Sequence, residues 1–260
     1  MNAGREKSVL RGHPWIFSGS VARAPQESSG EKPGRTVRVS DSNGNFLAWG
    51  AISPQSKIRV RVWSQNEAEV VGADFFFRRI TAAIDRRKLL SQTQNVNAFR
   101  LVHAESDGLP GLIVDKYGQI LVVQFLSGGV EFWRDVIVEQ LVKITSCEQI
   151  YERSDADIRH LEGLDSQKGL LVGEGLSIPV AINEGELQYW VDIPQGQKTG
   201  FFLDQRDNRA VVRGLAAKKT VLDCFAYTGG FTIAALVGGA KKATAVEASA
   251  DAIDLVKENL

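Results

Sequence analysis

The segment that most constrains the fold lies near the C-terminal end, where two strand-like runs flank a glycine turn and a helix. Residues 220–225 read TVLDCF, an apolar run with an acid near its end. Two glycines follow within a turn, and residues 231–237 have the composition of a buried helix. A second apolar run, 243–247, ends on Glu247. A strand, a helix and a second strand in this order predict a βαβ unit with parallel strands.

This predicted βαβ unit has the features of a nucleotide site. Gly229 and Gly230 lack a Cβ, so the backbone of the turn can approach a ligand closely. The helix after the turn points its free N–H groups at the same place. Glu247 ends the second strand 24 residues after Asp223, where a carboxylate accepts hydrogen bonds from ribose hydroxyls in βαβ cofactor sites.

The sequence of the turn favours S-adenosylmethionine (SAM) over a nicotinamide dinucleotide. The nicotinamide fingerprint is G-x-G-x-x-G, and the corresponding run here, AYTGGF at 226–231, lacks its first and third glycines. Asp223 at the end of the first strand is unusual in a dinucleotide fold and common in SAM sites, where it faces the methionine end of the cofactor. An ordinary α/β turn that binds nothing is the alternative interpretation.

The charge of the chain is unevenly distributed. Residues 1–61 contain ten Lys and Arg against four Asp and Glu, whereas the whole chain is neutral. Residues 62–260 therefore carry the compensating excess of six negative charges. A cationic segment at one end of a neutral chain is typical of a protein with an anionic partner. A chance excess of Lys and Arg explains the charge equally well.

The basic segment reads as a small β domain. Strand-like runs lie at 35–39, 46–52 and 57–63. The last run alternates basic and apolar residues, which predicts one solvated, cationic face. A helix is expected over 74–91, where the apolar residues fall near one face and most charges are basic.

The middle of the chain, from 98 to 194, has a mixed α+β pattern. It includes an expected hairpin over 112–125 and an amphipathic helix over 131–144. A loop rich in Gly and Thr at 195–200 then leads into the C-terminal α/β region.

Several classes of protein are disfavoured by the sequence. No stretch approaches the roughly 18–20 apolar residues of a membrane span. The first residues contain no apolar signal-peptide core, and the two cysteines, Cys147 and Cys224, lie far apart, so we expect a reducing, cytoplasmic location. The three histidines have no metal-ligand spacing, so we expect no metal site.

Five runs carry a resemblance to a known family. They are GHPWIF at 12–17, RLVHAESDGLPGLIVD at 100–115, ERSDADIR at 152–159, KTGFFLDQRDNR at 198–209 and DCFAYTGGF at 223–231. With these runs the chain resembles the ribosomal RNA large-subunit methyltransferases of the I type. These are SAM-dependent enzymes with a PUA domain that make 5-methylcytosine in 23S rRNA.

The resemblance implies a multidomain protein of α/β and α+β class. Residues 1–70 would form a PUA-like β barrel that binds RNA, and residues 71–190 a central α+β domain. Residues 191–260 would form the start of a class I, Rossmann-like SAM methyltransferase domain. The implied cofactor is SAM and the implied partner is ribosomal RNA of the large subunit, with no membrane and no metal involved. Oligomerisation is left open, because sheet edges left unpaired in an incomplete domain can drive association.

The resemblance also assigns roles to residues. The loop over the methionine end of SAM would contain Lys198, Thr199, Phe201, Asp204 and Arg206. The remaining cofactor-binding residues would be Asp223, Phe225, Tyr227, Thr228, Gly229, Gly230 and Glu247. Candidates for RNA contact are Arg5, Lys7, Arg11, His13, Trp15, Lys57, Arg59 and Arg61.

The chain departs from the family pattern in its catalytic residues. The family carries an Asp-Pro-Pro motif and a nucleophilic Cys further along the methyltransferase domain, and neither occurs here. Methylation of C5 of cytosine requires a thiolate that adds to C6. We interpret Cys224 and Cys147 as packing residues, so we expect the catalytic residues beyond Leu260 and no activity from these residues alone.

Two other functions are compatible with the same residues. The chain could be a non-catalytic RNA-binding module, or, with less support, a nicotinamide-dependent oxidoreductase. The sequence does not identify the modified nucleotide, and it does not establish that the target base is cytosine. It also gives no role for the conspicuous block 104–111.

Overall fold

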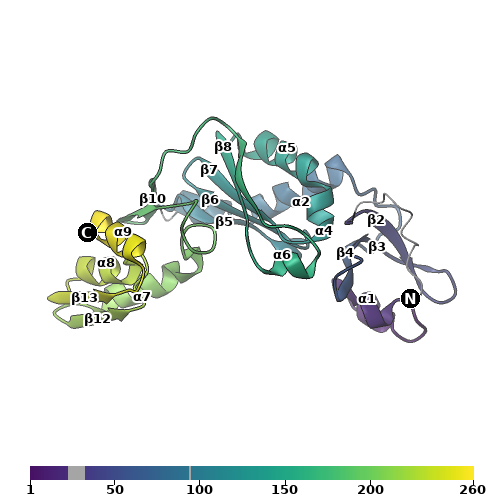
Figure 1. Cartoon of the computed structure of the whole chain (residues 1–260), viewed down its shortest axis with the longest axis horizontal. Coiled ribbons are helices and arrows are strands. Elements are labelled where there is room, and N and C mark those ends of the chain that lie inside the picture. The colour runs from purple at the N-terminus through teal and green to yellow at the C-terminus, as the bar shows by residue number, and fades with distance from the viewer. Residues whose placement is uncertain (23–32, 94) are drawn as a thin grey trace. The chain divides into compact units, whose positions relative to one another are not determined.

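A computed structural model describes residues 1–22, 33–93 and 95–260 (Figure 1). These residues form two compact units. The first unit contains residues 1–87, 101–114 and 120–174, and the second contains residues 88–100, 115–119 and 175–260. The division of the sequence into domains at 1–70, 71–190 and 191–260 stays a prediction.

The first unit begins with a small four-stranded sheet. Its order is β1-β4-β3-β2, and every neighbouring pair is antiparallel. The strands are β1 (Trp15–Phe17), β2 (Thr36–Ser40), β3 (Phe46–Ile52) and β4 (Ile58–Ser64), and the short helices α1 (Lys7–Leu10) and η1 (Ser18–Ser20) flank β1. Each of the three predicted strand runs is confirmed to within one residue.

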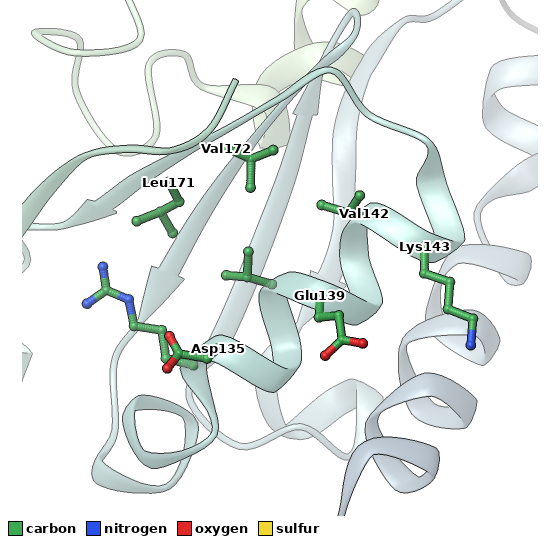
Figure 2. A pocket seen from close by; sticks show the side chains of 8 residues that line it. Asp135, Glu139, Val142, Lys143, Leu171 and Val172 are labelled. Carbon is green, nitrogen blue, oxygen red and sulfur yellow. The ribbon is translucent and has the colours of Figure 1, made fainter. Parts of the chain in front are cut away.

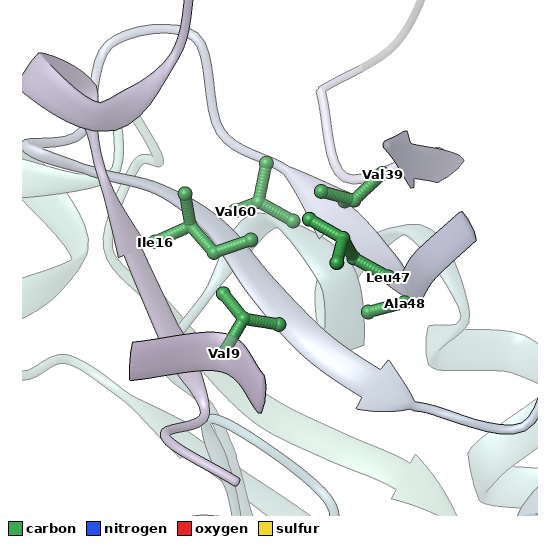
Figure 3. Close-up of a cluster of buried hydrophobic side chains, with 6 residues drawn as sticks. All are labelled: Val9, Ile16, Val39, Leu47, Ala48 and Val60. Atoms are coloured by element: carbon green, nitrogen blue, oxygen red, sulfur yellow. The ribbon is translucent and has the colours of Figure 1, made fainter. Parts of the chain in front are cut away.

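An apolar cluster holds this sheet together. Figure 3 shows side chains from α1 and all four strands meeting, namely Val9, Ile16, Val39, Leu47, Ala48 and Val60. None of the six is more than 8% exposed. The sheet therefore has its own core, as an independent β module requires.

The predicted cationic face of β4 is wrong at its centre. Arg61 is only 5% exposed, and its guanidinium donates to Glu162 at 2.7 Å. A charge can be buried when a carboxylate and further hydrogen bonds compensate for its lost hydration. The alternation of basic and apolar residues therefore marks a strand packed on both faces.

The rest of the first unit is an α+β arrangement. A five-stranded sheet has the order β5-β6-β7-β8-β9, with β7 and β8 parallel and β8 and β9 antiparallel. Its strands are β5 (Ala98–His103), β6 (Leu112–Tyr117), β7 (Ile120–Phe125), β8 (Gln149–Ser154) and β9 (Gln167–Val172). The boundary between the units passes through β5 and β6. The hairpin expected over 112–125 is confirmed as the neighbours β6 and β7.

The helices of this region are shorter than the sequence suggested. The expected helix 74–91 is two helices, α2 (Ala73–Asp85) and α3 (Lys88–Thr93), of which α3 belongs to the second unit. The expected helix 131–144 is α4 (Gly128–Phe132) followed by α5 (Arg134–Thr145). Within the first unit α2 packs against α5 (Figure 1). The short helices η2 (Ala104–Asp107) and α6 (Ile158–Leu161) complete the unit.

The second unit contains the predicted βαβ unit. The strands β12 (Thr220–Cys224) and β13 (Lys242–Val246) pair in parallel, and α8 (Gly230–Val237) connects them. Around them lie the hairpin β10 (Val180–Glu184) and β11 (Leu187–Val191), the short η3 (Leu203–Gln205), and the helices α7 (Arg206–Leu215) and α9 (Ala250–Asn259). Ser249 caps α9 by accepting the N–H of Ala252, as its position in the sequence indicated.

A buried ion pair joins two of these elements. Arg209 of α7 is 2% exposed and donates to both oxygens of Glu184 on β10, with Nε at 2.8 Å from Oε2. Its guanidinium also lies over the ring of Phe201, 4.6 Å from the centroid. This pair fixes the helix that follows the loop 195–205 against the hairpin of the same unit.

Candidate cofactor site

The glycine turn after β12 has an unusual backbone. Phe225 and Tyr227 adopt positive φ angles of 62° and 50°, and Gly229 follows with φ of 80° as the N-cap of α8. A side chain in this left-handed region is strained, so such residues cluster where a backbone must curve around a ligand. A Cβ on Gly229 would lie 3.1 Å from the Val256 side chain, a tight contact that Val256 would have to relieve by moving slightly.

Glu247 closes the turn from the second strand. Its carboxylate accepts the N–H of Tyr227 at 2.9 Å, of Ala248 at 2.8 Å and of Ser249 at 3.0 Å. The N–H groups of Ser249 and Tyr227 hold the pKa of the Glu247 carboxyl below its ordinary value. The group is therefore ionised at neutral pH and remains half-exposed, so it can accept a further hydrogen bond.

Asp223 lies one strand away, at the end of β12. It is half-buried and accepts the hydroxyl proton of Thr232 from α8 at 2.6 Å. The parallel pairing of β12 and β13 places both acids at the carboxyl edge of the sheet, Asp223 in register with Ala245. Ligands of open α/β sheets bind at this edge.

The loop before α7 is fastened to the glycine turn by one phenol. The hydroxyl of Tyr227 accepts the N–H of Gln197 at 2.9 Å and donates to the carbonyl of Gly200 at 2.8 Å. The Tyr227 ring also meets the Phe202 ring edge-on, with 5.4 Å between centroids. The two segments that the sequence predicted to share a site, 198–209 and 223–231, are therefore brought together.

Lys198 and Asp204 form the exposed part of this loop. The Lys198 ammonium lies 3.0 Å from the Asp204 carboxylate and 4.5 Å from the centroid of the Phe202 ring. Burial raises the pKa of Asp204, but Lys198 outweighs it, so the net shift is downward. Arg206 begins α7 and pairs with Asp207. All three predicted side chains thus lie on one stretch of backbone beside Tyr227.

Four other predicted residues have positions that bear on their roles. Thr199 and Phe201 are 1% and 2% exposed, with their side chains turned into the second unit. Phe225, by contrast, is 92% exposed. Thr228 is buried, and its hydroxyl has no hydrogen-bond partner among the described residues. Of these four residues, Phe225 can therefore contact a ligand with the least rearrangement.

The interpretation of Cys224 as a packing residue is wrong. Its side chain is exposed. Along β12 only Val221 and Asp223 are half-buried, while the alternate residues are exposed, because α8 covers one face of the strand. Cys147 is half-buried near the end of α5.

A pocket of about 600 Å³ lies next to the turn within the second unit. Tyr227, Thr228 and the loop residues Gln195 and Gln197 form one side of it. The lining also contains four acids, Asp251, Asp254 and Glu258 of helix α9 and Asp192, which directly follows β11. A space of this size beside the turn is compatible with binding a nucleoside-sized ligand.

A larger hollow of about 700 Å³ belongs to the first unit and contains none of the predicted site residues. Figure 2 shows it between α5 and β9, with Asp135, Glu139, Val142 and Lys143 on the helix and Leu171 and Val172 on the strand side. It lacks the turn and paired acids of a nucleotide site, so size alone does not identify the functional cavity.

The chemistry of the second unit fits SAM. In βαβ cofactor sites a carboxylate at the position of the ionised Glu247 accepts ribose hydroxyls, and a glycine turn allows backbone to approach a ligand. A model of the S-adenosylmethionine-dependent methyltransferases matches residues 118–259, and a PUA-like domain model matches residues 1–65. The chain belongs to the SAM-dependent methyltransferase family. This confirms the predicted fold class and the predicted cofactor.

Relatives with assigned names support the same family. The chain is 44% identical over 257 residues to a ribosomal RNA large subunit methyltransferase I of Erwinia tasmaniensis, and 44% identical to one of Yersinia pseudotuberculosis. Both matches cover 99% of this chain and 64% of the relative. The chain thus spans less than two thirds of the length of these methyltransferases.

Solved structures agree with the fold. A candidate SAM-dependent methyltransferase from Streptococcus mutans has a TM-score of 0.81 at 25% identity, with 99% of this chain and 65% of that chain covered. A crystal structure of a candidate methyltransferase complexed with SAH has a TM-score of 0.83 at 25% identity, covering 99% of this chain and 64% of the other.

The residues predicted to contact RNA all lie in the first unit of this methyltransferase-family chain. Arg5, Lys7, Arg11, His13 and Lys57 are exposed. Trp15 is half-buried and donates its indole N–H to Glu105 at 2.7 Å, and Arg59 is half-buried. The rings of His13, Trp15 and Phe17 lie within 6.0–6.4 Å of one another, so β1 presents an aromatic cluster. Phe17 was not predicted.

Among the described residues, no group of three or more His, Cys, Asp or Glu is arranged to hold a metal ion. The described helices are also too short or too polar to cross a membrane.

Sequence reasoning missed four residues that support the loop before α7. They are Arg100, Asp115, Tyr117 and Arg209. A signal was present for Asp115, because an acid inside the apolar run LIVDKY at 112–117 must find a partner when the strand is buried. Nothing local in the sequence points to Tyr117, whose partners lie more than eighty residues away.

Proposed function

We propose that this chain binds SAM and ribosomal RNA of the large subunit as part of an RNA methyltransferase. The observation that carries the proposal is the joining of the loop 195–204 to the glycine turn through Tyr227, beside the ionised Glu247. The names of the relatives support ribosomal RNA as the substrate.

In this proposal SAM supplies the methyl group, and the chain positions the cofactor. Glu247 accepts the ribose hydroxyls, and its carboxylate simultaneously holds the turn through the N–H of Tyr227. Asp223 and the loop containing Lys198 and Asp204 face the methionine end, while Gly229, Gly230 and Thr228 form the curved backbone against it. For Phe225 we propose a contact with the nucleoside, because its exposed ring is available to pack on a ligand.

For the RNA we propose a surface on the first unit. It consists of the exposed residues Arg5, Lys7, Arg11, His13 and Lys57, together with Trp15 and Arg59. Cations would contact phosphates, and the aromatic rings of β1 would stack on unpaired bases. We leave Arg61 out of this surface because its charge is already neutralised by Glu162.

The resemblance to the family supports C5 of a cytosine in 23S rRNA as the methylated position. That reaction needs a thiolate that adds to C6 of a flipped or single-stranded base. Within the family pattern this cysteine follows the region that the chain covers, so we propose that residues 1–260 bind both ligands without methylating RNA alone.

The test of cofactor binding is calorimetric titration with SAM, using NADH as the competing ligand class. We expect the wild-type chain to bind SAM and not NADH, and Glu247→Ala to lose at least ~tenfold in affinity because it removes a charge-assisted acceptor. Glu186→Ala, at an exposed acid in the turn between β10 and β11 that does not line the pocket beside the glycine turn, is the matched control and should bind as the wild type does. Binding of NADH alone would contradict the proposal, and binding of RNA without SAM would favour the non-catalytic RNA-binding module.

A further inference from the structure

A chain of hydrogen bonds runs beneath the cofactor loop, entirely within the second unit. The N–H of Phe201 donates to the hydroxyl of Tyr117 at 3.2 Å. The Tyr117 hydroxyl lies 2.9 Å from the Thr199 hydroxyl, and Thr199 donates to Asp115 Oδ2 at 2.7 Å. Arg100 closes the chain with two bonds to the same carboxylate, at 2.8 and 2.9 Å.

The direction of every bond in this chain follows from chemistry. A carboxylate paired with a guanidinium only accepts, so Thr199 must give its single proton to Asp115. Tyr117 must then donate to Thr199, which leaves the phenol oxygen free to accept the Phe201 N–H. Asp115, Tyr117 and Thr199 are each no more than 1% exposed. A fully satisfied buried network of this kind specifies one conformation.

The backbone held by this network is strained. Lys198 has φ of 56° and Gly200 has φ of 134°, on either side of Thr199. A non-glycine residue persists at positive φ only where surrounding contacts hold it. Thr199 and Phe201 hold this backbone through their hydrogen bonds in the buried network. Tyr227 of the glycine turn holds it through hydrogen bonds to Gln197 and Gly200.

We infer that Arg100, Asp115, Tyr117 and Thr199 are positioning residues, which hold the loop 195–204 in its cofactor-binding conformation before SAM arrives. This inference rests on the proposed function for the role of the loop. It changes the role of Thr199, which the sequence assigned to direct cofactor contact. It also gives the end of the conspicuous run 100–115 a purpose, because Arg100 and Asp115 form the anchor of the network.

The first test measures the loop without any ligand. Trypsin cuts after Lys198, and the products 1–198 and 199–260 are identified by mass spectrometry. We expect Tyr117→Phe and Thr199→Val to be cut there at least ~fivefold faster than the wild type, because local opening becomes more favourable when the anchor is lost. Thr199→Ser keeps the hydroxyl and should restore resistance. Rates are normalised to the unfolded chains, so a change next to the cut bond does not bias the comparison.

The second test measures SAM affinity by calorimetry on the same proteins. We expect Tyr117→Phe and Thr199→Val to bind SAM ~tenfold more weakly, with Thr199→Ser and the exposed-strand control Thr244→Val close to the wild type. Thermal unfolding of each variant separates loss of the loop from loss of the fold. Tyr117→Phe leaves the loop sequence unchanged, so this variant alone tests the role of the network if Thr199→Val does not fold.

The outcomes separate the two proposals. Unchanged cutting at Lys198 in both Tyr117→Phe and Thr199→Val would overturn the inference, whatever the wild type binds. Faster cutting with unchanged SAM affinity would also overturn it, since the loop would then not matter to the cofactor. A wild-type chain that does not bind SAM would contradict the proposed function instead, and the cutting rates would still show whether the network holds the loop.

Discussion

Two carboxylates in this protein each accept hydrogen bonds from several donors. Glu247 accepts three peptide N–H groups, and Asp107 accepts the N–H of His103 together with Arg86 and Arg87. Asp107 lies in the block 104–111, whose role the sequence left open. Its contacts show that it ties η2 to the basic end of α2 within the first unit. These hydrogen bonds depend on which residues the fold brings next to each acid, and no sequence pattern encodes that. The sequence could therefore identify the acids but not their hydrogen-bond donors.

Asp107 gives a prediction of pH dependence. Burial raises the pKa of this carboxyl, but Arg86 and Arg87 outweigh burial and the net pKa falls below 3.8. The stabilisation from ionised Asp107 is therefore complete above that value and is lost as the pH falls through the lowered pKa. We expect Asp107→Asn to reduce the free energy of unfolding by ~2 kcal/mol at pH 7 and by less at pH 3, which lies below the ordinary pKa of the group. Urea unfolding at both pH values measures this, with the exposed Glu139→Gln as control. Equal losses at the two pH values would show that charge is not responsible.

At the scale of elements, hydrophobic periodicity located the strands and helices well. It did not predict where a helix is interrupted or which strand residues are buried. The run 74–91 has continuous helical periodicity, yet it divides into α2 and α3. Strand β4 alternates like a half-solvated strand, yet Arg61 is buried against Glu162. Both differences come from tertiary partners distant in the sequence. The βαβ unit was predictable because its turn, helix and strands are local and consecutive.

Helix α7 provides a prediction with an internal control. Arg209 and Arg213 lie one turn apart, and each pairs with an acid of the β10–β11 hairpin. Arg209 and Glu184 are buried, whereas Glu186 is exposed. We expect Arg209→Ala to cost ~3–5 kcal/mol of stability, because it leaves a buried carboxylate unpaired. Arg213→Ala should cost no more than ~0.5 kcal/mol. Chemical denaturation compares the two, and similar losses would mean that burial of the pair is not what stabilises α7.

At the scale of the whole molecule, the basic segment 1–61 and the predicted cofactor residues belong to different units. The exposed basic residues of the proposed RNA surface lie in the first unit, while all twelve predicted cofactor residues lie in the second. Net charge alone predicted an anionic partner but not its contact residues, because exposure depends on folding. The family resemblance covered both units, and it could not distinguish Thr199 as a support from residues that touch the cofactor.

The charge distribution predicts a salt-dependent interaction with RNA. Binding of a single-stranded RNA oligonucleotide should weaken as salt rises, because cations on the protein displace counterions from phosphates. Replacing Arg5, Lys7 and Arg11 together by Ala should lower the slope of log affinity against log salt by ~2. Filter binding over a salt series measures the slope. Replacing Lys218, Lys219 and Lys241 in the second unit is the matched control, and an equal change there would contradict the proposed surface.

The hydrogen-bond chain from Phe201 to Arg100 limits which substitutions its members can accept during evolution. Each member can bond in only one direction, so replacing Asp115 with an apolar residue leaves Thr199 and Arg100 without their shared acceptor. Changing Tyr117 alone likewise removes a partner from both Phe201 and Thr199. Descendants of this protein should therefore keep Arg100, Asp115, Tyr117 and a hydroxyl at position 199 together or lose them together, although positions 100 and 199 are far apart in the sequence.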